Sequence, residues 1–155
     1  MLERAILISV WIVTTILLIW LIPKAKLHMA IVSFLIMQVP SWVLGLTVVE
    51  LGFIVYPVRF FAHASQTSFT FEFYALPSMS ALFNVYNPKG KWWRKLLFSL
   101  AFTAPMILCE SIIEHYTKCI DYLHWTWYLS WISLLFVLHL AYWLTRWFMS
   151  TLKNN

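Results

Sequence analysis

The chain has 155 residues, of which 62% are hydrophobic and 11% are charged, against roughly 45–50% and about 25% in ordinary globular chains. So few charged side chains cannot cover a water-soluble surface, and the composition therefore predicts an integral membrane protein. The net charge of +5 does not indicate nucleic-acid binding, because the basic residues stand in short groups between apolar runs.

Long apolar runs alternate with short polar connections along the chain. The first run is too long for the apolar region of a signal peptide, and we expect it to be retained as a span. The predicted fold is all-α, a polytopic membrane helical bundle in a single domain, 1–155, with about five crossings. The segment 51–63 is expected to be interfacial or partly re-entrant, and a sixth crossing there is the less favoured alternative. The predicted spans are 5–22, 27–50, 67–86, 92–117 and 125–149.

The distribution of Lys and Arg predicts the orientation. Arg4, Arg59 and Lys118 fall on one side of the predicted bundle. Eight basic residues fall on the other side, which the positive-inside rule places in the cytoplasm, with the N-terminus outside and the C-terminus inside. These eight are Lys24, Lys26, Lys89, Lys91, Arg94, Lys95, Arg146 and Lys153.

The fourth span carries a polar stripe. At 100° per residue, one face collects Ser99, Thr103, Glu110, Glu114, Thr117 and Asp121. The opposite face is apolar, so the stripe should turn toward other helices or water rather than lipid. The favoured interpretation is structural, with Glu114 paired to Lys118 and Glu110 bonded to a neighbouring helix. The alternative is a ligand, ion or proton site.

Two other spans carry features that bear on packing and chemistry. His139 lies near the middle of the fifth span. We expect a neutral imidazole bonded to a carbonyl or hydroxyl, and a proton relay is the alternative. In the second span, Ser41, Gly45 and Gly52 share one face with Gln38 at its edge. Small residues there predict the close approach of another helix.

Acidic residues recur at one membrane depth. Glu50, Glu72, Glu110 and Glu114 all fall in the outer half of their spans under this topology, and Arg59 lies in the connection on the same side. We therefore expect one outward-leaning polar pocket with Arg59 folded over it to bridge carboxylates. With a single arginine for several acids, at least one glutamate should be protonated or bind a cation.

Sequence signatures of known enzymes do not occur: the chain has no HExxH, Walker A, GxSxG or CxxC motif. We expect no metal centre and no cofactor. Cys109 and Cys119 lie ten positions apart on one predicted helix, about 15 Å along its axis, so no internal disulfide is expected.

Several short motifs resemble a known family. They are Tyr56-Pro57-Val58-Arg59-Phe60, Phe71-Glu72-Phe73 with Pro77, Asn84-Val85-Tyr86-Asn87, Glu110 and Glu114 with Thr117, and Trp125-Thr126-Trp127-Tyr128. From about Leu27 to Met149 the pattern resembles a family of small multi-pass membrane proteins of spore-forming Firmicutes. The resemblance implies a bacterial cytoplasmic membrane and supports the acidic residues as a set. The family carries no established activity, so it adds no reaction.

The sequence favours a non-enzymatic membrane subunit that binds a partner, lipid or small molecule through the acidic cluster. A small proton- or cation-linked transporter or channel is the alternative, and a lipid-modifying enzyme is third. The expected partners are the lipid bilayer and a membrane protein or a second copy of the chain, not a nucleic acid.

Reporter fusions test the orientation. Fusions after Lys26, Lys95 and Asn155 should report the cytoplasm, because the basic side of the protein stays inside. A fusion at Ala64 should report the outside, and a cytoplasmic signal there would contradict the topology.

Overall fold

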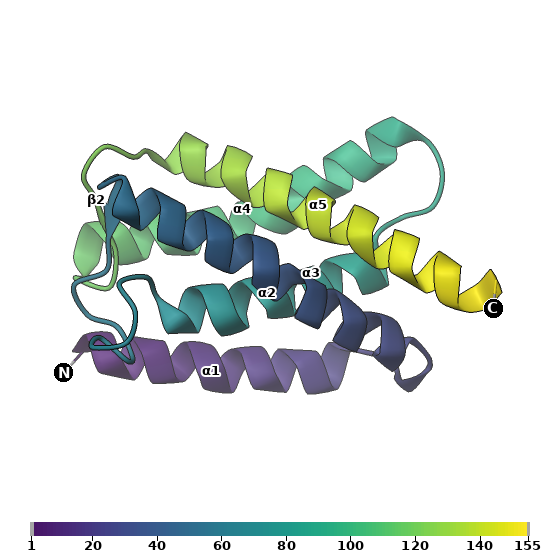
Figure 1. Ribbon diagram of the computed structural model, residues 1–155, viewed down its shortest axis with the longest axis horizontal. Helices are drawn as coiled ribbons and strands as arrows, with labels where there is room; N and C mark the ends of the chain where they lie inside the picture. Colours follow the sequence, from purple (N-terminus) through teal and green to yellow (C-terminus); the bar gives the residue numbers. More distant parts are fainter. Residues whose placement is uncertain (1, 155) are drawn as a thin grey trace.

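Helices run alternately in opposite directions along one long axis (Figure 1). The computed structural model describes the backbone of residues 2–154 and the side chains of residues 2–151, so the predictions for Asn155 and for the Lys153 side chain lie outside it. The predicted all-α bundle is confirmed, and four of its helices are long and apolar enough to cross a membrane. These are α1 (Leu2–Leu21), α2 (Leu27–Glu50, preceded by the short turn η1, Lys24–Lys26), α4 (Trp92–Tyr116) and α5 (Trp127–Asn154).

The third predicted span differs from a regular membrane helix. It begins as a π-helix, η2 (Thr70–Ala75), and continues as α3 (Leu76–Tyr86). Pro77 lies at the start of α3. Since proline has no backbone N–H, it cannot complete the preceding α-turn, and a wider turn takes its place. The segment is shorter and less regular than the sequence predicts.

The connections at the N-terminal end of the bundle form a small sheet. Strand β1 (Ile54–Val55) pairs antiparallel with β2 (Asp121–Tyr122), in the register Ile54 with Tyr122 and Val55 with Asp121. The segment 51–63 thus contains β1 and turns at one end of the bundle and forms no helix of its own. The sequence did not predict the pairing, which satisfies backbone groups that neither connection could satisfy by itself.

The polar stripe on α4 faces inward for most of its length. Ser99, Thr103 and Glu110 are buried, and Ile107 is buried among them. On the opposite face Leu108 is 64% exposed. The helical period alone therefore predicts correctly which face of α4 meets the other helices.

Polar side chains hold α2 against α3. The Ser33 hydroxyl lies 2.9 Å from that of Ser80 and 3.0 Å from the Ser80 carbonyl oxygen, and Asn84 Nδ2 donates to Ser33 Oγ at 2.6 Å. All three residues have 0% exposure. Small hydroxyl-bearing residues let the two backbones approach closely, as they do in other membrane helix pairs.

Helix α1 lies at the edge of the bundle and docks on η2. The Trp11 ring stacks on that of Tyr74 with centroids 4.0 Å apart. Trp11 Nε1 donates to Thr70 Oγ1 at 3.1 Å, and the Tyr74 hydroxyl lies 2.6 Å from Thr15 Oγ1. An aromatic stack with polar handles thus attaches a helix that is otherwise largely exposed.

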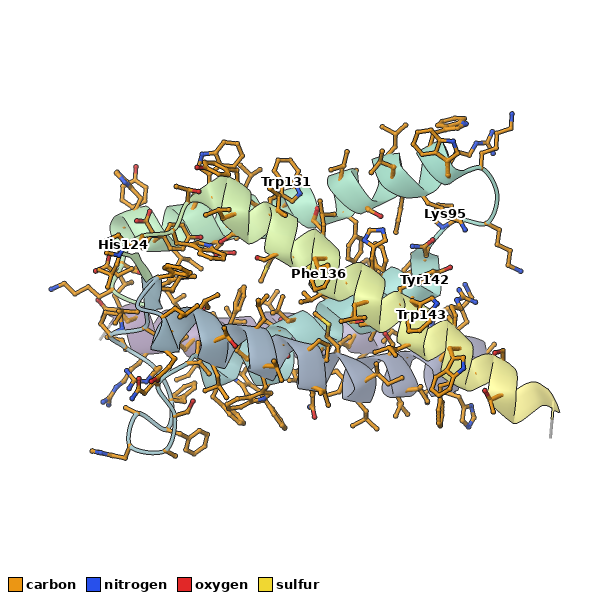
Figure 2. All side chains as sticks on the ribbon, turned by 45° about the horizontal axis from the view of Figure 1, so that its top comes forward. Lys95, His124, Trp131, Phe136, Tyr142 and Trp143 are labelled. Atoms are coloured by element: carbon orange, nitrogen blue, oxygen red, sulfur yellow. The ribbon has the colours of Figure 1, made fainter. Side chains whose placement is uncertain are left out.

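The ends of the bundle carry the connections that the sequence assigns to opposite sides. Figure 2 shows His124 at one end and Lys95 at the other. Both cysteines are free, as predicted. However, α4 ends at Tyr116, so Cys119 lies beyond the helix that was expected to carry both.

Replacement of Ser33 by leucine tests the α2–α3 contact. We expect Ser33→Leu to lower the free energy of unfolding by about 1–3 kcal/mol, because the added carbons overpack a filled interface. Ser33→Ala should cost only about 0.6 kcal/mol, the typical value of one interhelical hydrogen bond in a membrane. Unfolding in mixed micelles measures both. The exposed Ser150→Leu is the matched control, and an equal loss there would contradict the prediction.

Candidate functional site

The irregular turn at η2 presents two backbone carbonyl groups to α2. In a helix, the Pro77 nitrogen would donate to the carbonyl of Phe73 or, in a π-turn, to that of Glu72. Helix α2 supplies substitute donors for these two carbonyls. Ser41 Oγ donates to the backbone carbonyl oxygen of Glu72 at 2.8 Å, and Gln38 Nε2 lies 3.5 Å from that of Phe73. These contacts fix the backbone of η2 and with it the origin of the Glu72 side chain.

Gly45 on α2 makes room for the Glu72 carboxyl group. A Cβ at this position would overlap with Oε1, Cδ and Cγ of Glu72. Glu72 is 4% exposed. Its carboxyl oxygens receive no hydrogen bond from any residue that the structure describes. The predicted close approach to the small face of α2 is confirmed at Ser41 and Gly45, where the approaching residue is an acid. It is wrong at Gly52, which lies beyond the end of α2 at φ 70° with nothing within 4 Å of a Cβ there.

The second acid, Glu110, is held by hydroxyl groups. Ser130 Oγ donates to Glu110 Oε1 at 2.7 Å, and the Tyr122 hydroxyl donates to the same oxygen. Trp125 Nε1 in turn donates to Ser130 Oγ at 2.8 Å. The β2 connection and the start of α5 thus orient the carboxyl group of α4, and among the described residues no donor engages its second oxygen.

Both acids line one small cavity between the helices. Its volume is about 50 Å³, and its lining contains no Lys, Arg or His. A cavity needs at least about 10–15 Å³ on this measure to hold one water molecule, so this one accommodates a few water-sized groups and no lipid headgroup. Tyr56, Leu44, Gly45, Phe71 and Trp125 are among the remaining lining residues.

The two tyrosines near Glu110 lie in the connections and are protonated at neutral pH. Burial raises the pKa of the Tyr56 phenol well above its ordinary value of 10.0, and the neighbouring Glu72 and Glu110 add to the shift. Burial also raises the pKa of Tyr122, with a further contribution from Glu110. Both phenols are therefore hydrogen-bond donors over the whole physiological range.

Two of the four predicted acids lie outside the cavity. Glu50 is exposed at the last position of α2. Glu114 is only partly buried and does not line the cavity. Its predicted i+4 pairing with Lys118 is also wrong, because the helix ends at Tyr116 and the backbone is extended at Thr117. A shared membrane depth does not bring these acids together.

Arg59 does not bridge carboxylates as predicted. Its guanidinium donates to the backbone oxygens of Tyr56 and Ser65 at 2.7 Å each and of Ala62 at 3.2 Å. These carbonyls belong to its own connection, where the tight turn includes Phe61 at φ 56°. Arg59 therefore stabilises the loop that carries Tyr56, and among the described residues Glu72 and Glu110 have no basic partner.

His139 is exposed on α5 and lies apart from the cavity. Its Nδ1–H donates to the Leu135 carbonyl at 2.8 Å, and Nε2 lies 3.3 Å from Ser99 Oγ. Nine positions separate it from Ser130, about 14 Å along the helix. The imidazole thus contacts a backbone carbonyl and a hydroxyl, the two kinds of partner that the structural interpretation expects.

The sequence analysis missed Tyr56, Tyr122 and Ser130. On the fifth span the sequence singled out His139, although the buried face of α5 carries mostly small residues. Ser130, Leu134, Ala141 and Thr145 recur there at helical spacing, and all four are buried. This period was the available signal for Ser130. The two tyrosines lie in connections, where no period applies.

Within residues 2–151, no three His, Cys, Asp or Glu side chains gather closely enough to hold a metal ion. Two carboxylates, hydroxyls and water could still bind a monovalent cation, since hard cations prefer oxygen ligands.

Fold and site together define a class: an all-α helical bundle, with helices long and apolar enough to cross a membrane, that encloses a pair of acids. Comparison of the chain with family models, curated proteins and solved structures gives no match.

Replacement of Gly45 by alanine tests the contact with Glu72. We expect Gly45→Ala to destabilise the protein by about 1–3 kcal/mol, because the new methyl group displaces a buried carboxyl. The same change in a Glu72→Ala background should cost much less, with a coupling of at least about 0.5 kcal/mol. Denaturant unfolding of the four proteins measures the cycle, and additive effects would contradict the contact.

Proposed function

We propose that the protein is a non-enzymatic membrane subunit that binds one small monovalent cation between Glu72 and Glu110. The observation that carries the proposal is the convergence of two buried acids on one cavity whose lining has no basic side chain. Two uncompensated buried carboxylates are costly in a low dielectric, and a bound cation or proton removes that cost.

The size of the cavity supports binding of a small ion. At about 50 Å³ it suits a sodium ion with water or a single ammonium group, and it has no room for the substrate of a lipid-modifying enzyme. The oxygen atoms of the lining, from the two carboxyl groups and the hydroxyls of Tyr56, Ser130 and Ser133, suit a hard monovalent cation.

A second candidate is cation- or proton-linked transport. Polar contacts continue between α4 and α5 beyond the cavity: Trp131 Nε1 donates to Thr103 Oγ1 at 2.7 Å, and Ser99 contacts His139. Buried Ile107 and Leu134 belong to the apolar core that lies between these polar levels. A binding role therefore agrees better with the packing than transport does, because an ion that moved from the cavity toward His139 would have to cross this apolar core.

The proposal places the protein in a bacterial cytoplasmic membrane, with the cavity in the outer half. The charge pattern and the family resemblance given above support this placement. A membrane protein or a second copy of the chain is the partner class expected for so small a bundle.

Thermal unfolding in lipid nanodiscs tests the site. Sodium chloride and methylammonium chloride should raise the Tm in a concentration-dependent way relative to N-methylglucamine chloride of equal ionic strength. A ligand at 100 times its Kd adds about 2.7 kcal/mol of stability. Glu72→Gln and Glu110→Gln should fold and lose the shift, because each removes one of the two charges that attract the cation.

Glu50→Gln is the matched control. It removes an acid from the same end of the bundle at an exposed position and should keep the full shift. The proposal fails if neither salt raises the Tm of the wild-type protein, or if Glu72→Gln retains the shift.

A further inference from the structure

A large apolar groove lies beside the acidic cavity. It runs between α1 and α4, and it has a volume of about 550 Å³, within the range of roughly 300–1,000 Å³ typical of ligand sites. Val10, Val13 and Leu17 form part of one wall, and Phe102 and Met106 form part of the other. Almost all of the lining is hydrocarbon, which suits an aliphatic chain.

The groove and the cavity share three lining residues. Tyr56, Phe71 and Glu110 line both spaces. The two spaces are therefore adjacent, and one of the side chains that lie between them is an acid. Another apolar groove, between α2 and α5, has a similar volume of about 620 Å³ but is lined by no acid. Of these two grooves, the α1–α4 groove is the one with an acid, Glu110, in its lining.

We propose that the cation bound by this site is the primary ammonium group of a single-chain amphiphile, whose tail lies in the α1–α4 groove and whose head enters the cavity between Glu110 and Glu72. This inference rests on the proposed function and names its ligand class. An ammonium group brings one positive charge and three N–H donors to a space lined by two acids and no basic residue. The complementarity of charge selects the head, and the wall that the two spaces share, with Glu110 in it, selects the tail.

The cavity also selects against larger heads. About 50 Å³ accommodates a group of the size of water, whereas a trimethylammonium head replaces every N–H with a methyl group and can donate no hydrogen bond. A carboxylate head would be repelled by the two acids of the lining. We therefore expect recognition of primary amines over quaternary amines and fatty acids of equal chain length.

Two adjacent positions on α1 provide a matched pair of variants. Val13 is 53% exposed and lines the groove, and Ile12 is 55% exposed and does not. Val13→Trp should fill the groove without touching either acid, while Ile12→Trp places the same ring elsewhere on the helix. Both positions are exposed, so neither change should prevent folding.

Equilibrium binding of radiolabelled dodecylammonium to the protein in phosphatidylcholine nanodiscs, with empty nanodiscs subtracted, tests the inference. Val13→Trp should weaken dodecylammonium binding by about tenfold or more, equivalent to 1.4 kcal/mol, and leave the Tm shift by methylammonium unchanged. Ile12→Trp should bind like the wild type. Dodecyltrimethylammonium and dodecanoate should fail to compete.

The outcomes separate this inference from the proposed function. Equal binding of dodecylammonium by the two tryptophan variants, or competition by dodecyltrimethylammonium, would overturn the amphiphile and leave the cation site standing. A Tm shift by sodium but not by methylammonium would do the same. If no cation shifts the Tm, the proposed function fails and the amphiphile fails with it.

Discussion

Pro77 has no backbone N–H, and the arrangement at the centre of this bundle follows from that missing donor. In hydrocarbon, a carbonyl without a donor costs several kcal/mol, so an interruption in a helix must be satisfied by a neighbour. Here the neighbour is α2, whose Ser41 and Gln38 face the carbonyls of Glu72 and Phe73. Because these carbonyls need donors, α2 packs directly against η2. The same face of α2 carries Gly45, which lies against the Glu72 side chain.

The second acid depends on a different part of the chain. Glu110 projects from α4, but its donors come from the β2 connection and the first turn of α5. The pairing of β1 with β2 brings the two connections together, and it thereby places Tyr56 and Tyr122 near the same carboxyl. Each acid is thus positioned by other elements: Glu72 by α2, and Glu110 by the β2 connection and α5. These contacts make the site more rigid.

The sequence predicts the helices from the length of their apolar runs, and it predicts the inward face of α4 from the helical period. A helix repeats every 3.6 residues, and lipid tolerates Leu108 where it would not tolerate Glu110. The prediction that four acids cluster around Arg59 was wrong for a physical reason. Depth in the membrane fixes only the position of a residue along the helix axis, whereas the rotation of each helix decides which way its side chain points. Glu50 and Glu114 were predicted at the depth of Glu110, but neither side chain lines its cavity.

The loop around Arg59 shows a further limit of sequence reasoning. An arginine near several acids suggests a salt bridge, yet a tight turn offers carbonyl oxygens at shorter range. Such a local choice cannot be predicted without the backbone path, which includes the left-handed residue Phe61. The same holds for Tyr122, whose neighbours depend on a strand register and not on a motif.

The edge position of α1 has a consequence for the order of events during synthesis. Its contacts with η2, Trp11 to Thr70 and Thr15 to Tyr74, each span 59 residues. At about 5–20 residues per second, a ribosome needs roughly 3–12 s to supply that length. Meanwhile the hydroxyls of Ser9 and Thr15 can bond to the helix's own carbonyls, of Ala5 and Trp11. The hydroxyl groups of α1 therefore have hydrogen-bond partners within the helix before η2, the surface on which α1 docks, has been synthesised.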